Sequence, residues 1–176
     1  MPQSIHKMMD KLTVMSCLLF FTADLFALAS LLTPNWIVTH VGGDTRLGLL
    51  QSCFTIYRRN SVCQTTDLTH PEWTISLLAI LFGIFNISLT IVLIIVSQWR
   101  PVLLHYAKWI GFSAVILFCI AAVIFPIGFS KDEIGGAPYQ LPNSFQVGIS
   151  YISFVMSLWI TVVSELFASK VCLPHF

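Results

Sequence analysis

Charged residues are scarce in this sequence. Only 10% of its 176 residues are Asp, Glu, Lys or Arg, whereas a soluble domain carries about a quarter. Apolar types make up 56% of the chain, which is typical of a membrane protein. The formal net charge is +1 and no basic stretch is interleaved with aromatic residues, so nucleic acid is not expected as a partner. The expected partners are membrane lipid and other proteins.

Motifs for catalysis are missing too. The five histidines are scattered without an i, i+4 pair, and no Cys-x-x-Cys motif occurs, so no metal site is expected. There is no Walker loop, nucleophile elbow or Gly-x-Gly-x-x-Gly motif. The segments expected on the cytoplasmic side total roughly thirty residues, too few for a catalytic domain. We therefore expect neither an enzyme nor a cofactor.

Long apolar runs are the dominant feature that is present. A helix needs about 20 apolar residues to cross the bilayer. Four runs meet this length, and they are Leu12 to Leu32, Thr74 to Val96, Trp109 to Phe129 and Val147 to Ala168. The sequence therefore predicts one mainly α-helical domain over residues 1–176, with spans at 12–32, 74–96, 109–129 and 147–168.

The first run also has features of a signal peptide. Ala27-Leu28-Ala29 resembles a cleavage site after an apolar region, and cleavage there would leave three spans. However, the apolar run continues to Leu32 and carries Asp24 just before the supposed site. We therefore expect the first helix to be retained.

Positive charges indicate how the chain lies in the membrane. Lys7, Lys11, Arg100, Lys108 and Lys170 fall in short segments on one side, while four positive residues are spread over longer loops on the other. This density favours cytoplasmic N- and C-termini in a multi-pass plasma-membrane protein. Residues 97–108 and the tail 169–176 would then be cytoplasmic, and residues 33–73 and 130–146 extracellular.

The five cysteines fall into three groups. Cys53 and Cys63 lie together in the first outer loop, where two thiols of a secretory-pathway protein most simply form a disulfide. Cys17 and Cys119 lie within spans, where cysteine usually acts as a small apolar residue. Cys172 lies beside the membrane on the cytoplasmic side, where palmitoylation and an unmodified thiol are both open.

The first outer loop has the pattern of a small sheet. Residues 36–41 are rich in β-branched types, and residues 53–57 alternate. Arg58-Arg59-Asn60-Ser61 supplies a turn, after which residues 62–65 can return as an antiparallel strand. The two cysteines would then face each other, and their disulfide would stabilise a hairpin that is marginal alone.

Two acids lie inside the expected spans. An ionised Asp24 at mid-membrane costs about 2.5 to 3.5 kcal/mol, so it should face the other helices. Asn86 lies at similar depth, and a hydrogen bond between them is the structural interpretation; contact with a partner helix or a proton path is the functional one. Glu165 lies about one turn from the cytoplasmic end, where it can reach toward Lys170, and we expect little function there.

Proline and glycine shape the third loop. Pro126 and Gly128 are expected to bend or end the third span where this loop begins. Further prolines and Gly135-Gly136 indicate a tight loop packed against the outer sheet, with a flexible linker as the alternative.

Six residues of the first outer loop resemble a known signature. Trp36, Gly48, Leu49, Leu50, Cys53 and Cys63 are similar to the Trp, Gly-Leu-Trp, Cys and Cys signature of the claudin and peripheral myelin protein superfamily. The resemblance implies a claudin-like, left-handed four-helix transmembrane bundle with a disulfide-stapled extracellular antiparallel sheet. Leu50 stands where the superfamily usually has Trp, and the tail at residues 172–176 lacks the Tyr-Val ending of claudins. Both departures count against a junction-forming protein.

A closer resemblance runs through most of the chain. The family of modulators of smoothened, or attenuators of Hedgehog, has similar blocks in the same order at residues 9–13, 71–73, 106–110, 124–129, 135–143 and 170–174. It implies a membrane adaptor that lowers Smoothened at the cell surface and primary cilium, acting with a multi-EGF single-pass membrane protein and a RING ubiquitin ligase. A claudin-type barrier protein and an auxiliary channel subunit are the alternatives.

Overall fold

The chain combines long helices with a small sheet at one end. The structure is a computed structural model that describes residues 2–39, 44–55, 62–66, 71–130 and 134–172, without the side chains of residues 2–10 and 170–172. The expected turn at residues 58–61 and the side chain of Cys172 lie outside this part. The helices are α1 (Pro2–Leu32), α2 (Pro71–Val96), α3 (Val102–Ile124) and α4 (Ile149–Cys172).

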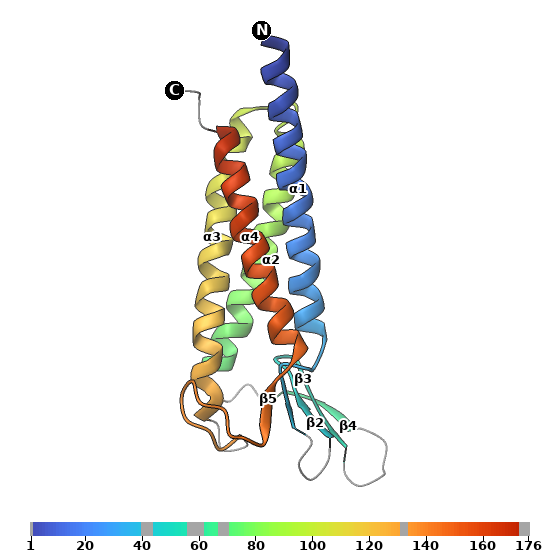
Figure 1. Cartoon of the computed structure of the whole chain (residues 1–176), viewed down its shortest axis with the longest axis vertical. Coiled ribbons are helices and arrows are strands. Elements are labelled where there is room, and N and C mark those ends of the chain that lie inside the picture. The colour runs from blue at the N-terminus through green and yellow to red at the C-terminus, as the bar shows by residue number, and fades with distance from the viewer. Residues whose placement is uncertain (1, 40–43, 56–61, 67–70, 131–133, 173–176) are drawn as a thin grey trace.

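The helices lie side by side and give the molecule two distinct ends. Both termini lie at one end, here called the terminal end, and the sheet lies at the other, the sheet end (Figure 1). Four segments of the described chain are long and apolar enough to cross a membrane: Lys11–Leu32, Pro71–Val96, Val102–Ser130 and Ile149–Ser169. The protein is therefore a membrane protein, and the large apolar side chains exposed along these helices face lipid.

The buried side of each helix repeats at intervals of three and four residues. On α2 the buried positions include Ile80, Gly83, Ile87, Thr90 and Ile94. The corresponding series on α3 is Ala107, Gly111, Ala114, Phe118 and Ala121, and on α4 it is Ser150, Phe154, Ser157, Thr161, Ser164 and Ala168. This spacing places one continuous stripe of each helix against its neighbours.

Small polar residues join α1 to α4. Ser16 donates a hydrogen bond to the carbonyl of Ser164 at 3.1 Å, and Ser157 donates to the carbonyl of Ala23 at 2.7 Å. Small residues allow two helix backbones to approach closely. In a membrane, the hydrophobic effect does not drive helices together, because lipid tails are as apolar as the side chains, so close packing and hydrogen bonds decide which helices associate. These hydrogen bonds therefore help to set the packing of the first helix on the last.

The third helix changes its winding at the proline. α3 ends at Ile124 and continues as a 3₁₀ helix, η1 (Phe125–Ser130), as expected from Pro126, which has no backbone N–H to donate. Gly128 lies against the ring of Trp73, where a side chain would have no room. The turn thus brings the end of α3 against the start of α2.

The sheet has five antiparallel strands in the order β4-β3-β2-β1-β5. They are β1 (Ile37–Thr39), β2 (Asp44–Leu47), β3 (Gln51–Thr55), β4 (Val62–Thr65) and β5 (Phe145–Val147). Strand β1 begins one residue later than the expected residues 36–41, of which residues 40 and 41 lie outside the described part of the structure. Its partner β2 lies within a segment in which no strand was expected. The antiparallel pairing of β3 with β4 confirms the expected hairpin.

The second outer loop contributes the fifth strand. Phe145–Val147 pairs with β1, so Val147 belongs to a strand and not to the fourth span, whose helix starts at Ile149. Before this strand the loop folds back onto η1, because the N–H of Tyr139 donates to the carbonyl of Pro126 at 3.0 Å. The expectation that this loop packs against the sheet is confirmed.

Candidate functional site

Trp36 connects the sheet to the helices. It is 1% exposed, and its indole N–H donates to the carbonyl of Ser30, at the end of α1, at 2.8 Å. Its ring lies 4.8 Å from that of Phe125 and 5.6 Å from that of Phe154, between centroids. Because these rings belong to η1 and α4, one side chain fixes the first strand to three helical elements.

Gly48 allows the chain to turn beneath Trp36. Its N–H donates to the carbonyl of Gln51 at 3.0 Å, and its own carbonyl accepts from the hydroxyl of Thr66 at 2.7 Å. A Cβ at this position would lie 2.7 Å from Cα of Pro34, so only glycine fits. Thr66, which the sequence did not single out, also donates its N–H to the carbonyl of Leu50 and thus holds the turn from two sides.

Gly48→Ala is expected to displace this turn, because the added methyl group meets backbone atoms of Pro34 and Gln51 that cannot rotate away. Overpacking of this kind costs about 1 to 3 kcal/mol. Thermal unfolding of the purified variant in detergent measures the loss. Gly135→Asn is the matched control, because Gly135 has open space around it and asparagine tolerates its positive φ of 67°. An unchanged unfolding temperature for Gly48→Ala would contradict the prediction.

The remaining signature residues lie beside this turn. Leu49 is 1% exposed, whereas Leu50 is only partly buried and packs against the edge of the core. Cys53 and Cys63 are directly opposed on β3 and β4 and form the expected disulfide. The structure thus brings Trp36, Gly48 and Leu49 together as the base of the sheet and places the disulfide in its outer hairpin.

The predicted hydrogen bond between Asp24 and Asn86 is wrong. Asp24 accepts instead from the hydroxyl of Ser88 at 2.9 Å, and Asn86 donates to the hydroxyl of Ser113 on α3, also at 2.9 Å. Asn86 and Ser88 flank Ile87, which is completely buried, so one faces α3 and the other faces α1. Counting residues from the ends of a span gives the depth of a side chain but not its direction around the helix.

Asp24→Leu is expected to lower the free energy of unfolding by about 0.6 to 1.7 kcal/mol, the range for a hydrogen bond between membrane helices. Asp24→Asn should lose less, because the amide oxygen still accepts from Ser88. Unfolding in mixed detergent micelles gives both values, and Ser88→Ala combined with Asp24→Leu should show a non-additive loss. If Asp24→Leu leaves stability unchanged but abolishes capture of a partner protein, the acid serves recognition and not packing.

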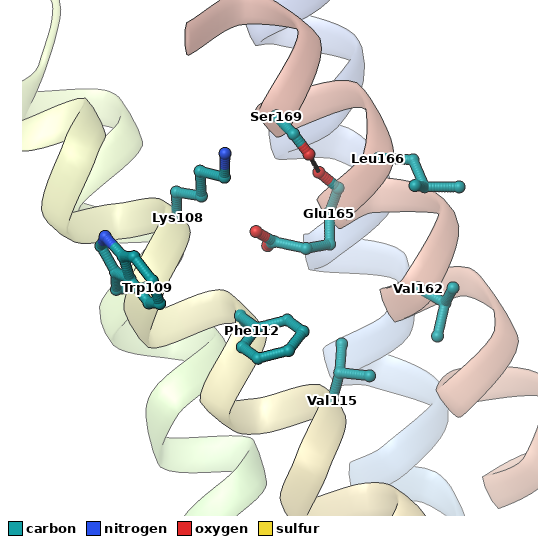
Figure 2. Close-up of a pocket in the computed structure, with 8 residues that line it drawn as sticks. All are labelled: Lys108, Trp109, Phe112, Val115, Val162, Glu165, Leu166 and Ser169. Carbon is teal, nitrogen blue, oxygen red and sulfur yellow. Dashed lines mark hydrogen bonds between the residues drawn. The ribbon is translucent and has the colours of Figure 1, made fainter. Parts of the chain in front are cut away.

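Glu165 is buried between the helices, and Lys170, toward which it was expected to reach, has its side chain outside the described part of the structure. Glu165 is 8% exposed, and within the described part of the chain neither carboxylate oxygen has a hydrogen-bond partner. Its position depends on Gly111 of α3, since a Cβ there would lie 2.5 Å from Oε2 of Glu165. The side chain points from α4 toward α3 and borders a cavity of about 470 Å³ near the terminal end (Figure 2).

A comparison with known families connects this architecture to a biological process. The sequence model of the family described as Attenuator of Hedgehog matches residues 33–174, which is more than half of the chain. The chain belongs to the attenuator of Hedgehog family. Its function is therefore attenuation of Hedgehog signalling, as a membrane protein with a disulfide-linked sheet.

The match covers the sheet, its disulfide and the three later helices. The attenuator of Hedgehog family is a family of signalling modulators. Among the described residues, no three His, Cys, Asp or Glu side chains gather in a group that could hold a metal ion.

Three features of the site were not predicted from the sequence: the hydrogen bonds of Ser88 and Thr66, and the burial of Glu165. Each depends on a contact with another helix or strand, which the spacing of residues along one segment does not reveal.

Proposed function

We propose that the protein is an adaptor that attenuates Hedgehog signalling by lowering Smoothened at the cell surface and primary cilium. It acts with a multi-EGF single-pass membrane protein and a RING ubiquitin ligase, which together mark the receptor for removal. Membership of the attenuator of Hedgehog family is the observation that carries this proposal. The adaptor role follows from the resemblance of the sequence to modulators of smoothened.

The proposed architecture is a claudin-like, left-handed bundle in the plasma membrane. The buried positions of α3 are spaced alternately by four and three residues, as in Ala107, Gly111, Ala114 and Phe118. This average of 3.5 residues per turn supports a left-handed supercoil.

The proposed orientation puts the terminal end in the cytoplasm, because Lys11, Arg100 and Lys108 lie toward it. The disulfide of the sheet end fits an oxidising, extracellular location.

The distribution of residues between the two ends of the bundle supports the proposed adaptor role. α2 and α3 are joined at the terminal end by residues 97–101 alone, whereas the sheet end holds five strands and their loops. This distribution supports the proposal that another protein supplies the ubiquitin ligase. On the sheet, Phe54 and Val62 are opposed across β3 and β4 and are 36% and 59% exposed, which makes this pair the proposed contact for the partner's extracellular part.

The decisive measurement is the abundance of Smoothened at the surface of cells with and without the protein. Loss of the protein should raise surface and ciliary Smoothened, and wild-type protein should restore the lower level. Val62→Lys is expected to reach the surface yet fail to restore it, because its exposed side chain contributes little to folding. Unchanged Smoothened after loss of the protein would contradict the proposed function, and continuous strands at contacts between transfected fibroblasts would favour a barrier protein.

A further inference from the structure

A cavity opens between α3 and α4 near the terminal end. Its volume of about 470 Å³ lies in the range of roughly 300 to 1,000 Å³ that is common for small-molecule sites. Most of its wall is apolar, and its lining residues are Lys108, Trp109, Phe112, Val115, Val162, Glu165, Leu166 and Ser169.

Two opposite charges border this cavity and attract each other, but their charged atoms are too far apart for an ion pair. In the described part of the chain, no ion pair or hydrogen bond joins Lys108 to Glu165. In Figure 2 the two side chains project from α3 and α4 into the same gap, with Phe112 below them. Glu165 is more than nine-tenths buried, and burial of an unpaired acid is costly unless something supplies hydrogen-bond donors.

Aromatic residues place the mouth of the cavity at the membrane surface. Trp99, Tyr106 and Trp109 are 77%, 58% and 61% exposed, and the indole N–H of Trp109 donates to His105 at 3.2 Å. Tryptophan and tyrosine gather where hydrocarbon meets lipid head groups. The charged rim therefore lies near the head groups, while Phe112, Val115 and Val162 continue into the hydrocarbon.

We propose that the cavity binds a phospholipid whose head group carries a primary ammonium, namely phosphatidylethanolamine. Its phosphate binds Lys108, its ammonium donates to Glu165, and one acyl chain lies against the apolar wall. The carboxylate lies close to Gly111, and the proposed binding requires it to turn about its own side-chain bonds toward the ammonium. Phosphatidylcholine has no N–H to donate, and the additional carboxylate of phosphatidylserine is repelled by Glu165.

The test uses the full chain in nanodiscs that contain equal amounts of phosphatidylethanolamine and phosphatidylcholine. After release into detergent, native mass spectrometry counts the lipids that the protein retains. The expected preference for phosphatidylethanolamine is about tenfold, which corresponds to about 1.4 kcal/mol from a charge-assisted hydrogen bond. Equal retention of the two lipids, or retention of neither, overturns the proposal. So does a preference for phosphatidylserine over phosphatidylethanolamine in a second nanodisc that contains equal amounts of those two lipids.

Matched variants assign the preference to the two charges. Glu165→Gln is expected to reduce the preference to about parity, since only the ionised acid makes the stronger bond. Lys108→Met should weaken retention of both lipids while their ratio is kept. Glu72→Gln makes the same chemical change at the first turn of α2, away from the cavity, and should behave as wild type. A wild-type ratio in Glu165→Gln overturns the proposal, and the wild-type measurement decides it even if that variant does not fold.

Discussion

Replacing Cys53 with serine is expected to abolish delivery of the protein to the cell surface. β4 is an edge strand paired only with β3, and all four of its residues are exposed, so it has little burial to keep it in place. The disulfide closes a loop with a sequence separation of 10, which is worth roughly 3 kcal/mol in the chain-entropy model. Without this bond the hairpin opens, and the secretory pathway retains a chain with an exposed, unpaired strand.

Surface labelling of a tagged protein measures this delivery against total expression. Cys63→Ser should give the same loss, because either change removes the same bond, and the double variant should be no worse than either single one. Cys119→Ser is the matched control, since Cys119 is a free cysteine on the exposed side of α3. Normal surface levels of Cys53→Ser would mean that strand pairing alone holds the hairpin.

The helices and the disulfide could be predicted because each depends on a local property of the sequence. A run of about 20 apolar residues determines a span whatever its neighbours are. The pairing of Cys53 with Cys63 follows from two short strands around one turn, and the observed register places them opposite each other. The end of α3 at Ile124 similarly follows from Pro126, which acts on its own helix.

The features that sequence reasoning missed depend on contacts between distant segments. β5 has only three residues and borders the apolar run of the fourth span, so its pairing with β1 is visible only once both are in place. Glu165 is buried because Gly111, on a different helix, leaves space for its carboxylate. Asp24 pairs with Ser88 because of how α2 is rotated about its axis, which its apolar length does not determine.

Trp36→Ala should be the most destabilising single change among the signature residues outside the disulfide. The indole is almost fully buried among Phe125, Tyr151 and Phe154, and truncation of a buried tryptophan costs about 3 to 5 kcal/mol. The loss falls where the sheet meets the helices, so the sheet should detach while the transmembrane helices persist. Thermal unfolding in detergent and proteolysis of the sheet should therefore both report the change.

Two further tryptophan variants separate packing from hydrogen bonding. Trp36→Phe keeps most of the ring contacts but removes the N–H that donates to the carbonyl of Ser30, which still accepts from the hydroxyl of Thr33 at 3.4 Å. Its loss should therefore be smaller, about 0.5 to 1.5 kcal/mol for one hydrogen bond. Trp159→Ala removes a ring that is 64% exposed toward lipid and should leave the sheet resistant to protease. If Trp36→Ala were as protease-resistant as Trp159→Ala, two backbone hydrogen bonds would be sufficient to hold the sheet in place: the N–H of residue 36 donates to the carbonyl of Leu47, and its carbonyl accepts from the N–H of Gly148. The signature tryptophan would then contribute to something other than the attachment of the sheet.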